Sequence, residues 1–252
     1  MIPTPSTSHV PYERVYEPAE DSFLLLDTLS SDTEMAFLRD RFNQRNDGSN
    51  THCHIPLVVE IGSGSGVVIS FVHAHCEMIL GRSDILTAGM DVNFHACKAT
   101  VKTMSMAEEE QLSISHGFYL GNILGDLTKS LVPKQVDLLL FNPPYVPTPE
   151  LPKLPTLDDA DVKMNDDSYL LSLSFSGGHD GMETTNRLLK YLPEILSPVY
   201  GCAYVLLCAQ NKPEEVKDMI RRSGNGFLVK TVGTSGKRAG WEKLQLIRIW
   251  RE

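Results

Sequence analysis

The sequence predicts an α/β domain built on a mainly parallel β-sheet with helices on both faces. Two observations carry this prediction: short apolar runs alternate along the chain with stretches of helical periodicity, and the first of these runs ends in a glycine-rich turn. Such alternation is typical of strand–helix–strand units, whose parallel strands bind ligands at their carboxyl ends. The length of 252 residues suits one domain, which we place over residues 1–252.

The first elements are an N-terminal tail and a helical region. Residues 1–15 are rich in Pro, Ser and Thr, and we expect them to form a flexible tail. Helical spacing of apolar residues follows from Pro18 to Leu38. Pro18 and the acidic pair Glu20 and Asp21 favour the first turn of a helix, because proline tolerates that position and carboxylates stabilise the positive end of the helix dipole.

The alternating part of the chain starts at residue 57. The expected strands are 57–61, 85–92, 112–118, 136–141, 203–208, 227–232 and 244–250, and the expected helices are 67–80, 94–106, 188–196 and 213–220. We expect the last two strands to form an antiparallel pair. Residues 147–168 interrupt the pattern with prolines and aspartates, and this stretch is too long and polar for a simple connection. It is expected to be either an active-site lid or a disordered loop.

The charge and the cysteine content indicate which kinds of partner the protein binds and in which cellular compartment it is located. The chain has 32 acidic and 23 basic residues, a formal net charge of -9, which argues against direct binding of nucleic acid. The odd count of 5 cysteines without CxxC spacing is typical of a reducing compartment. No apolar run is long enough to span a bilayer, so we expect no membrane partner. These observations predict a cytoplasmic location, with the nucleus as a second compartment.

The glycine-rich turn at residues 60–66 (EIGSGSG) joins the first strand to the first helix of the alternating part. Its glycines let the backbone approach a ligand closely, and the helix N-terminus offers free N–H groups to an anion. Asp91, at the end of the second strand, can accept hydrogen bonds from both hydroxyls of a ribose, or it can cap the following helix. The pattern favours a nucleoside-containing cofactor over a ligand-free turn. It leaves open whether that cofactor is a nicotinamide dinucleotide or S-adenosylmethionine.

The sequence Asn142-Pro143-Pro144-Tyr145 directly follows the strand 136–141. A plain strand-ending turn is one interpretation. However, the side-chain carbonyl of Asn142 and the backbone carbonyl of Pro143 can accept both N–H groups of an amide or exocyclic nitrogen. Proline adds no competing N–H donor, and Tyr145 can stack on a planar group. The motif therefore predicts methyl transfer to nitrogen, with catalysis mostly by positioning.

Several segments together resemble the HemK-like methyltransferases. They are residues 16–27 (YEPAEDSFLLLD), the turn at 60–66, the motif at 142–146 (NPPYV) and residues 176–181 (SGGHDG). The resemblance covers nearly the whole chain and is closest to the eukaryotic catalytic subunits that methylate a release factor. It implies a class I (Rossmann-like) methyltransferase fold, with seven strands in the order 3-2-1-4-5-7-6.

The resemblance also implies an activity, a cofactor and a partner. The activity is N5-methylation of the glutamine in the Gly-Gly-Gln tripeptide of the class-I translation release factor, a step connected with translation termination. The cofactor is S-adenosyl-L-methionine, and the partner is a small zinc-binding activator subunit in a heterodimer. Related proteins also methylate lysine, as in histones, or adenine N6 in DNA or RNA. A nicotinamide dehydrogenase and a non-catalytic adaptor are the alternatives from other classes.

The expected site residues combine the motifs with the resemblance. The catalytic residues are Asn142, Pro143 and Tyr145; the cofactor-binding residues are Ser22, Glu60, Gly62, Gly64, Asp91, Asn122, Ile123 and Asn142; the substrate-binding residues are Asn142, Pro143, Pro144 and Tyr145. Asn122 departs from the aspartate that relatives often have, although its carbonyl can still accept from an adenine amino group. Residues 52–54 (HCH) and 73–76 (HAHC) lack the paired spacing of a zinc site, so no metal is expected in this chain.

Overall fold

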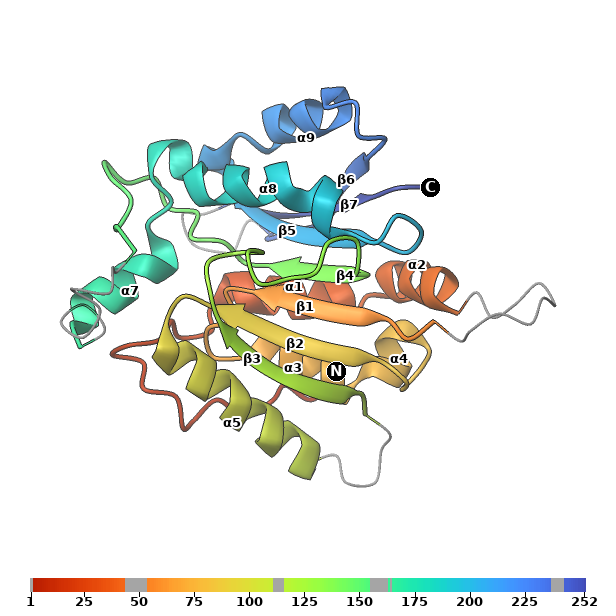
Figure 1. Ribbon diagram of the computed structural model, residues 1–252, viewed down its shortest axis with the longest axis horizontal. Helices are drawn as coiled ribbons and strands as arrows, with labels where there is room; N and C mark the ends of the chain where they lie inside the picture. Colours follow the sequence, from red (N-terminus) through yellow and green to blue (C-terminus); the bar gives the residue numbers. More distant parts are fainter. Residues whose placement is uncertain (1, 44–53, 111–115, 155–162, 164, 237–242) are drawn as a thin grey trace.

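The computed structural model describes residues 2–43, 54–110, 116–154, 163, 165–236 and 243–252. A central sheet of seven strands carries helices on both faces (Figure 1). The strand order is β3-β2-β1-β4-β5-β7-β6, which confirms the expected topology. β7 runs antiparallel to its two neighbours β5 and β6, whereas the other pairs are parallel.

The elements follow the predicted alternation. The strands are β1 (Leu57–Ile61), β2 (Leu86–Asp91), β3 (Phe118–Leu124), β4 (Leu138–Phe141), β5 (Cys202–Cys208), β6 (Leu228–Thr234) and β7 (Leu244–Trp250). The helices are α1 (Glu20–Leu29), α2 (Asp32–Phe42), α3 (Val67–Ala74), α4 (Cys76–Leu80), α5 (Phe94–Glu110), α7 (Asp167–Phe175), α8 (Glu183–Ile195) and α9 (Pro213–Arg222). Within the described residues, no helix has the length and apolar character required to cross a bilayer.

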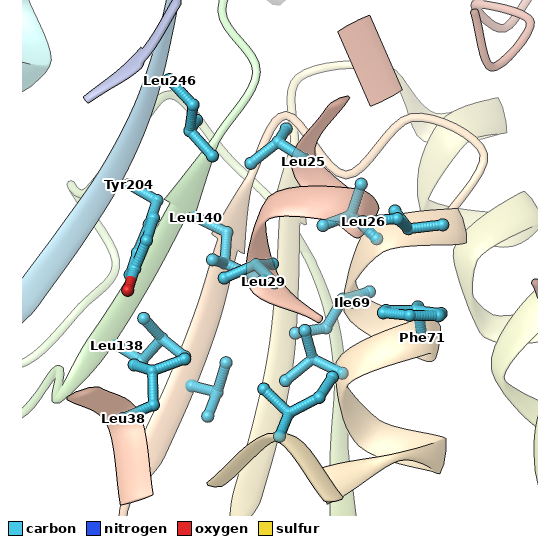
Figure 2. Close-up of a cluster of buried hydrophobic side chains, with 14 of the residues drawn as sticks. Leu25, Leu26, Leu29, Leu38, Ile69, Phe71, Leu138, Leu140, Tyr204 and Leu246 are labelled. Atoms are coloured by element: carbon cyan, nitrogen blue, oxygen red, sulfur yellow. The ribbon is translucent and has the colours of Figure 1, made fainter. Parts of the chain in front are cut away.

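The core consists of two apolar layers, one on each face of the sheet. Successive side chains of a strand point to opposite faces, so Leu138 and Leu140 of β4 join the layer under α1 to α4, beside Leu29 (Figure 2). Leu139 and Phe141 join the opposite layer, which α8 and α9 cover. β4 is therefore buried on both faces, and this rigid strand holds the residue that follows it, Asn142, in a defined place.

The third strand lies six residues later than the apolar pattern indicates. β3 starts at Phe118, whereas the predicted strand 112–118 falls largely on residues 111–115, outside the described part of the chain. The register explains the error: Thr87 pairs with Tyr119 and Ala88 with Gly121, so one extra residue, Leu120, forms a bulge. A bulge breaks the two-residue alternation by which a half-buried strand is detected in a sequence.

The N-terminal segment is packed and not a flexible tail, so that expectation is wrong. Val10 and Val15 are buried in one cluster with Ala96 and Ala99 of α5. Farther back, the carbonyl of Pro3 lies 2.9 Å from His75 Nε2, at the break between α3 and α4. The two valines and polar contacts such as this one hold the segment against α5 and α3, although its Pro, Ser and Thr content is typical of a disordered tail.

Candidate active site

A pocket opens at the carboxyl edge of the sheet, where a parallel sheet is expected to bind its ligand. It lies between the glycine-rich turn after β1, the end of β2 and the segment after β4, and residues of α1 and α7 complete its wall. α7 extends beyond this edge of the sheet, at the left of Figure 1. The expected site residues that line the pocket are Ser22, Glu60, Gly62, Gly64, Asp91, Asn142, Pro143 and Pro144.

At Gly62 and Gly64 the glycine-rich turn brings backbone without a side chain to the pocket. Gly62, Gly64 and Gly66 have φ of 66°, 53° and 81°, a region that other residues rarely adopt. A Cβ on Gly66 would also lie 2.6 Å from Thr100 Cα, so the turn packs directly against α5. Backbone conformation explains the glycines at all three positions, and close packing adds a second reason at Gly66.

Asp91 ties the turn to the end of β2. Its Oδ2 accepts from Gly64 N at 2.9 Å, and its Oδ1 accepts from Asn93 N at 2.8 Å. Burial raises the pKa of Asp91, against the lowering effect of three backbone N–H groups, those of Asn93, Gly64 and Val92. The bond to Asn93 N closes a turn before α5, and Asn93 itself caps that helix by accepting from His95 N at 2.9 Å, so the expected capping role of Asp91 is wrong. Because each carboxylate oxygen has two lone pairs, Asp91 keeps acceptors for a ribose.

Glu60 anchors the other side of the same turn. Its carboxylate is buried and accepts from Ile69 N in the first turn of α3 at 2.9 Å. Burial raises the pKa of Glu60 well above its ordinary value, and the negative charge of Asp91 adds to the rise, while the Ile69 N–H opposes it. The contact joins the end of β1 to α3 and holds the intervening glycines in place.

Asn142 presents an unsatisfied acceptor. Its Oδ1 is buried and has no hydrogen-bond partner among the described residues, and the residue is part of the pocket lining. A buried acceptor without a donor costs about 1–3 kcal/mol, so such an atom in a pocket marks the place where a ligand donor fits. Pro143 and Pro144 line the adjoining wall and have no N–H to occupy it.

Residues 176–181 support the Asn142 loop from behind, a role that the sequence analysis did not assign. A Cβ on Gly177 would lie 2.5 Å from Pro144 O, and one on Gly181 would lie 2.0 Å from Tyr145 O. Asn211 donates from Nδ2 to Tyr145 O at 2.9 Å, and its Oδ1 accepts from Cys208 N. The close glycine spacing in SGGHDG was the available signal for this packing, whereas nothing local to Asn211 indicated its role.

Tyr145 does not line the pocket, which contradicts its expected stacking on the substrate. Its side chain is buried in the same apolar layer as Leu25 and Leu26. Its hydroxyl donates to Asp21 Oδ2 at 3.4 Å. Burying the phenol ring in this apolar layer removes more of its surface from water than an open pocket would, and the Asp21 carboxylate satisfies the buried hydroxyl. Tyr145 therefore acts on the site through Asp21, which does line the pocket.

Asn122 and Ile123 also fall outside the pocket lining, so their expected cofactor contacts are corrected. Both lie within β3, where Asn122 Nδ2 donates to Ser63 Oγ at 3.0 Å beneath the glycine-rich turn. Because β3 ends later than predicted, the residues at its carboxyl end are Gly125, Asp126 and Leu127, and these line the pocket. An acidic residue just after an apolar strand was the missed signal.

Asp126 contributes an anchored carboxylate. It pairs with Lys129 Nζ at 2.7 Å and with Arg187 Nη2 at 2.5 Å. Burial acts to raise the pKa of Asp126, but these two cations outweigh it and hold the pKa below its ordinary value. The group therefore stays ionised near neutral pH and can accept hydrogen bonds from a ligand.

The sheet order and the pocket at its carboxyl edge define a class I methyltransferase, a class that uses S-adenosylmethionine. No protein-family model matches the chain. It is 32% identical over 254 residues to the eRF1 methyltransferase catalytic subunit mtq2 of Schizosaccharomyces pombe, covering 100% of this chain and 96% of that protein. It is 30% identical to methyltransferase HEMK2 of Homo sapiens, covering 98% and 95% of the two chains. The chain belongs to the HEMK2/mtq2 family of methyltransferases.

A solved structure supports the fold. The E. cuniculi Mtq2–Trm112 complex, described as responsible for methylating the eRF1 translation termination factor, matches with a TM-score of 0.50 and 20% identity, covering 95% of this chain and 99% of that one. Family membership decides between the cofactors that the glycine-rich turn left open. It favours S-adenosylmethionine over a nicotinamide dinucleotide.

Proposed function

We propose that this chain transfers a methyl group from S-adenosyl-L-methionine to the side-chain nitrogen of the glutamine in the Gly-Gly-Gln tripeptide of the class-I translation release factor. It would act as the catalytic subunit of a heterodimer. The observation that carries the proposal is the buried, unpartnered Oδ1 of Asn142 in the pocket. The relationship to mtq2, named for methylation of eRF1, supports this choice of substrate.

The pocket residues suit the cofactor. S-adenosyl-L-methionine supplies an electrophilic methyl group on a sulfonium. We assign Asp91 to the ribose hydroxyls and the backbone of the glycine-rich turn to close contact with the nucleoside. Asp126, in place of Asn122, is assigned to the amino group of the adenine, because a carboxylate accepts hydrogen bonds from such a group and Asp126 lines the pocket.

The chemistry of the site favours glutamine over lysine. A glutamine amide is neutral and planar, and its two N–H groups match the acceptors at Asn142 Oδ1 and Pro143 O. A lysine must first lose a proton, which requires a base. The carboxylates that line the pocket already accept hydrogen bonds from protein groups. We assign Asp91 and Asp126 to the cofactor, and Glu60 and Asp21 to contacts with Ile69 N and with Ser22 N and Tyr145. No pocket carboxylate is assigned as that base, which makes lysine the second candidate substrate.

The test compares substrates under identical conditions. We expect the purified enzyme complex to show a higher kcat/KM on a folded release factor than on a lysine-bearing histone tail, and no turnover on an adenine-containing duplex. The release factor with its Gly-Gly-Gln glutamine changed to alanine is the matched control. A kcat/KM for the lysine substrate equal to or above that for glutamine would replace the present proposal with a lysine methyltransferase.

The ribose assignment predicts a loss of cofactor affinity. Asp91→Ala should weaken binding of S-adenosyl-L-methionine at least about tenfold, because charge-assisted hydrogen bonds of about 1.5–3 kcal/mol each are lost. Isothermal titration calorimetry on the folded variant measures this. Asp27→Ala, which removes an exposed carboxylate of α1, is the control and should bind as the wild type does. Unchanged affinity in the Asp91 variant would remove the ribose assignment.

The partner that we propose is a small, zinc-binding activator subunit that adds a strand to β3. Among the described strands β3 is an edge, hydrogen-bonded only to β2. It exposes 68% of Phe118 and 54% each of Leu120 and Leu124. An apolar edge with unpaired backbone groups invites another strand. The Mtq2–Trm112 complex is consistent with a partner of this kind.

If the activator subunit adds a strand to β3, this chain should aggregate or lose cofactor binding when it is produced without that partner. Phe118→Lys should sharply reduce co-purification of the heterodimer, since it places a charge in the apolar interface. Val132→Lys is the control, because Val132 is equally exposed at 67% but lies outside β3. A monodisperse, fully active monomer would contradict the need for the partner, and equal effects of the two substitutions would contradict its location.

A further inference from the structure

Two histidines and a glutamate meet near the amino end of β3, away from the pocket at the carboxyl ends of the strands. His73 lies in the last turn of α3, Glu108 in the last turn of α5, and His116 just before β3. One ligand atom from each residue lies within 4.8 Å of the others. His73 Nε2 is 3.0 Å from Glu108 Oε1, and the two imidazole rings have centroids 5.2 Å apart.

The imidazole of His73 is held in the orientation that a metal ligand requires. The residue is fully buried, and its Nδ1 lies 2.8 Å from Thr87 Oγ1, which is also buried. Histidines that bind metals commonly donate their second N–H to a neighbouring oxygen, and this bond sets both ring orientation and tautomer. Without a cation, the single N–H of the neutral ring lies on Nε2 and is donated to Glu108, and Nδ1 accepts from the Thr87 hydroxyl. With a cation bound, the proton would lie on Nδ1 and be donated to Thr87 Oγ1, which frees the Nε2 lone pair for the cation.

A simple hydrogen bond between His73 and Glu108 would satisfy both side chains, but it would not explain the second imidazole beside them. The three groups also differ in exposure: His73 is closed off, whereas the Glu108 side chain is 35% exposed and His116 is half-buried. A hydrated cation can therefore reach the cluster from the Glu108 and His116 side and meet a preoriented third ligand.

We propose that His73, Glu108 and His116 form a binding site for a divalent transition-metal cation, with zinc the best match. Two imidazoles and one carboxylate are a donor set that zinc accepts readily, and three protein ligands leave a fourth position for water or for a group from another chain. Binding requires the His73 proton to move from Nε2 to Nδ1, and Glu108 to change from accepting a hydrogen bond to coordinating the cation. The cation would then join α3, the end of α5 and the start of the edge strand β3.

The test measures metal directly and does not depend on methyl transfer, so its failure is distinguishable from failure of the proposed function. The wild-type complex and three variants, Glu108→Gln, His116→Asn and Glu109→Gln, are stripped with a chelator, reloaded with Zn²⁺, dialysed and analysed by mass spectrometry of metal content. Glu109→Gln is the matched control, since Glu109 is the adjacent exposed carboxylate on α5. The substituted ligands are partly exposed, so these variants are expected to fold.

The expected result is one equivalent of zinc fewer in Glu108→Gln and His116→Asn than in the wild type and in Glu109→Gln. Any zinc held by the partner is common to all four samples and cancels in this difference. Titration with Zn²⁺ should show at least about tenfold weaker binding at this site in both ligand variants, and a larger Zn²⁺-dependent rise in melting temperature in the wild type and the control than in those two variants. Equal metal content and equal thermal shifts in all four proteins would overturn the proposal.

Discussion

Asn142→Ala is expected to lower kcat by about 10²–10³ while leaving the affinity for S-adenosyl-L-methionine within a few-fold of the wild type. The reason is that Oδ1 of Asn142 is a preplaced acceptor, already buried and without a partner among the described residues. It therefore needs no reorganisation when the substrate nitrogen arrives, and its contribution is to the transition state. Single-turnover kinetics on the release factor, with calorimetry for the cofactor, measure the two effects separately.

Two controls make the Asn142 result specific. Asn186→Ala makes the same truncation at an exposed position of α8 and should leave the rate unchanged. Asn142→Asp keeps an oxygen at the same place but replaces the amide NH₂ by a negative charge. If Asn142→Ala binds cofactor normally and still turns over at near the wild-type rate, Asn142 does not hold the substrate nitrogen.

Gly181→Ala is expected to lower kcat by about 10² or more without touching any residue of the pocket wall. A Cβ at this position would lie 2.0 Å from Tyr145 O, so the backbone that carries Asn142-Pro143-Pro144 must move. A displacement of about 1 Å in a positioning group typically costs about 10² in rate. We expect the loss in kcat rather than in cofactor affinity, because the glycine-rich turn and Asp91 lie on other segments.

The control for Gly181 is a glycine with the same backbone conformation and no neighbour. Gly224 has φ of 73°, close to the 69° of Gly181, and a Cβ there would meet nothing within 4 Å. Gly224→Ala therefore carries the same left-handed strain, about 1 kcal/mol, without the clash. Thermal unfolding and turnover of both variants separate strain from displacement. Equal turnover in the two variants would show that residues 176–181 do not position the catalytic loop.

The spacing of apolar residues was sufficient to predict the strands that are buried on both faces and the helices that are strictly amphipathic. β1 and β4 read as continuous apolar runs because both faces of each strand are covered, and α9 starts at Pro213 as predicted. The pattern failed at β3, where the bulge at Leu120 and exposure of an edge remove the usual alternation. It also failed in the N-terminal segment, where two buried valines outweigh a polar composition.

The residues of the candidate site also fall into two groups, those that the sequence predicted correctly and those that it did not. The glycine-rich turn, Asp91 and Asn142 were predictable because each directly follows a strand that the pattern places correctly, and the carboxyl ends of parallel strands meet at one edge. The roles of Asn122 and Ile123 rested on the family resemblance alone, and the structure places both residues within β3, whereas Gly125 and Asp126 after its end line the pocket. The expected stacking of Tyr145 on the substrate was wrong because its side chain points into the apolar layer and not into the pocket. In an irregular segment the direction of a side chain depends on neighbours that are distant in the sequence, so the local residues do not predict it.

The sequence by itself determined the class of fold, the cofactor-type turn and the acceptor at Asn142, since these depend on residue type and on contacts that are close along the chain. Only the tertiary structure decided that Asp126 faces the pocket and that Asn211 and Gly181 support the catalytic loop. It also decided that His73, Glu108 and His116 meet. The physical reason is that these contacts join residues far apart in the chain, and their geometry is set by how the layers pack on the sheet.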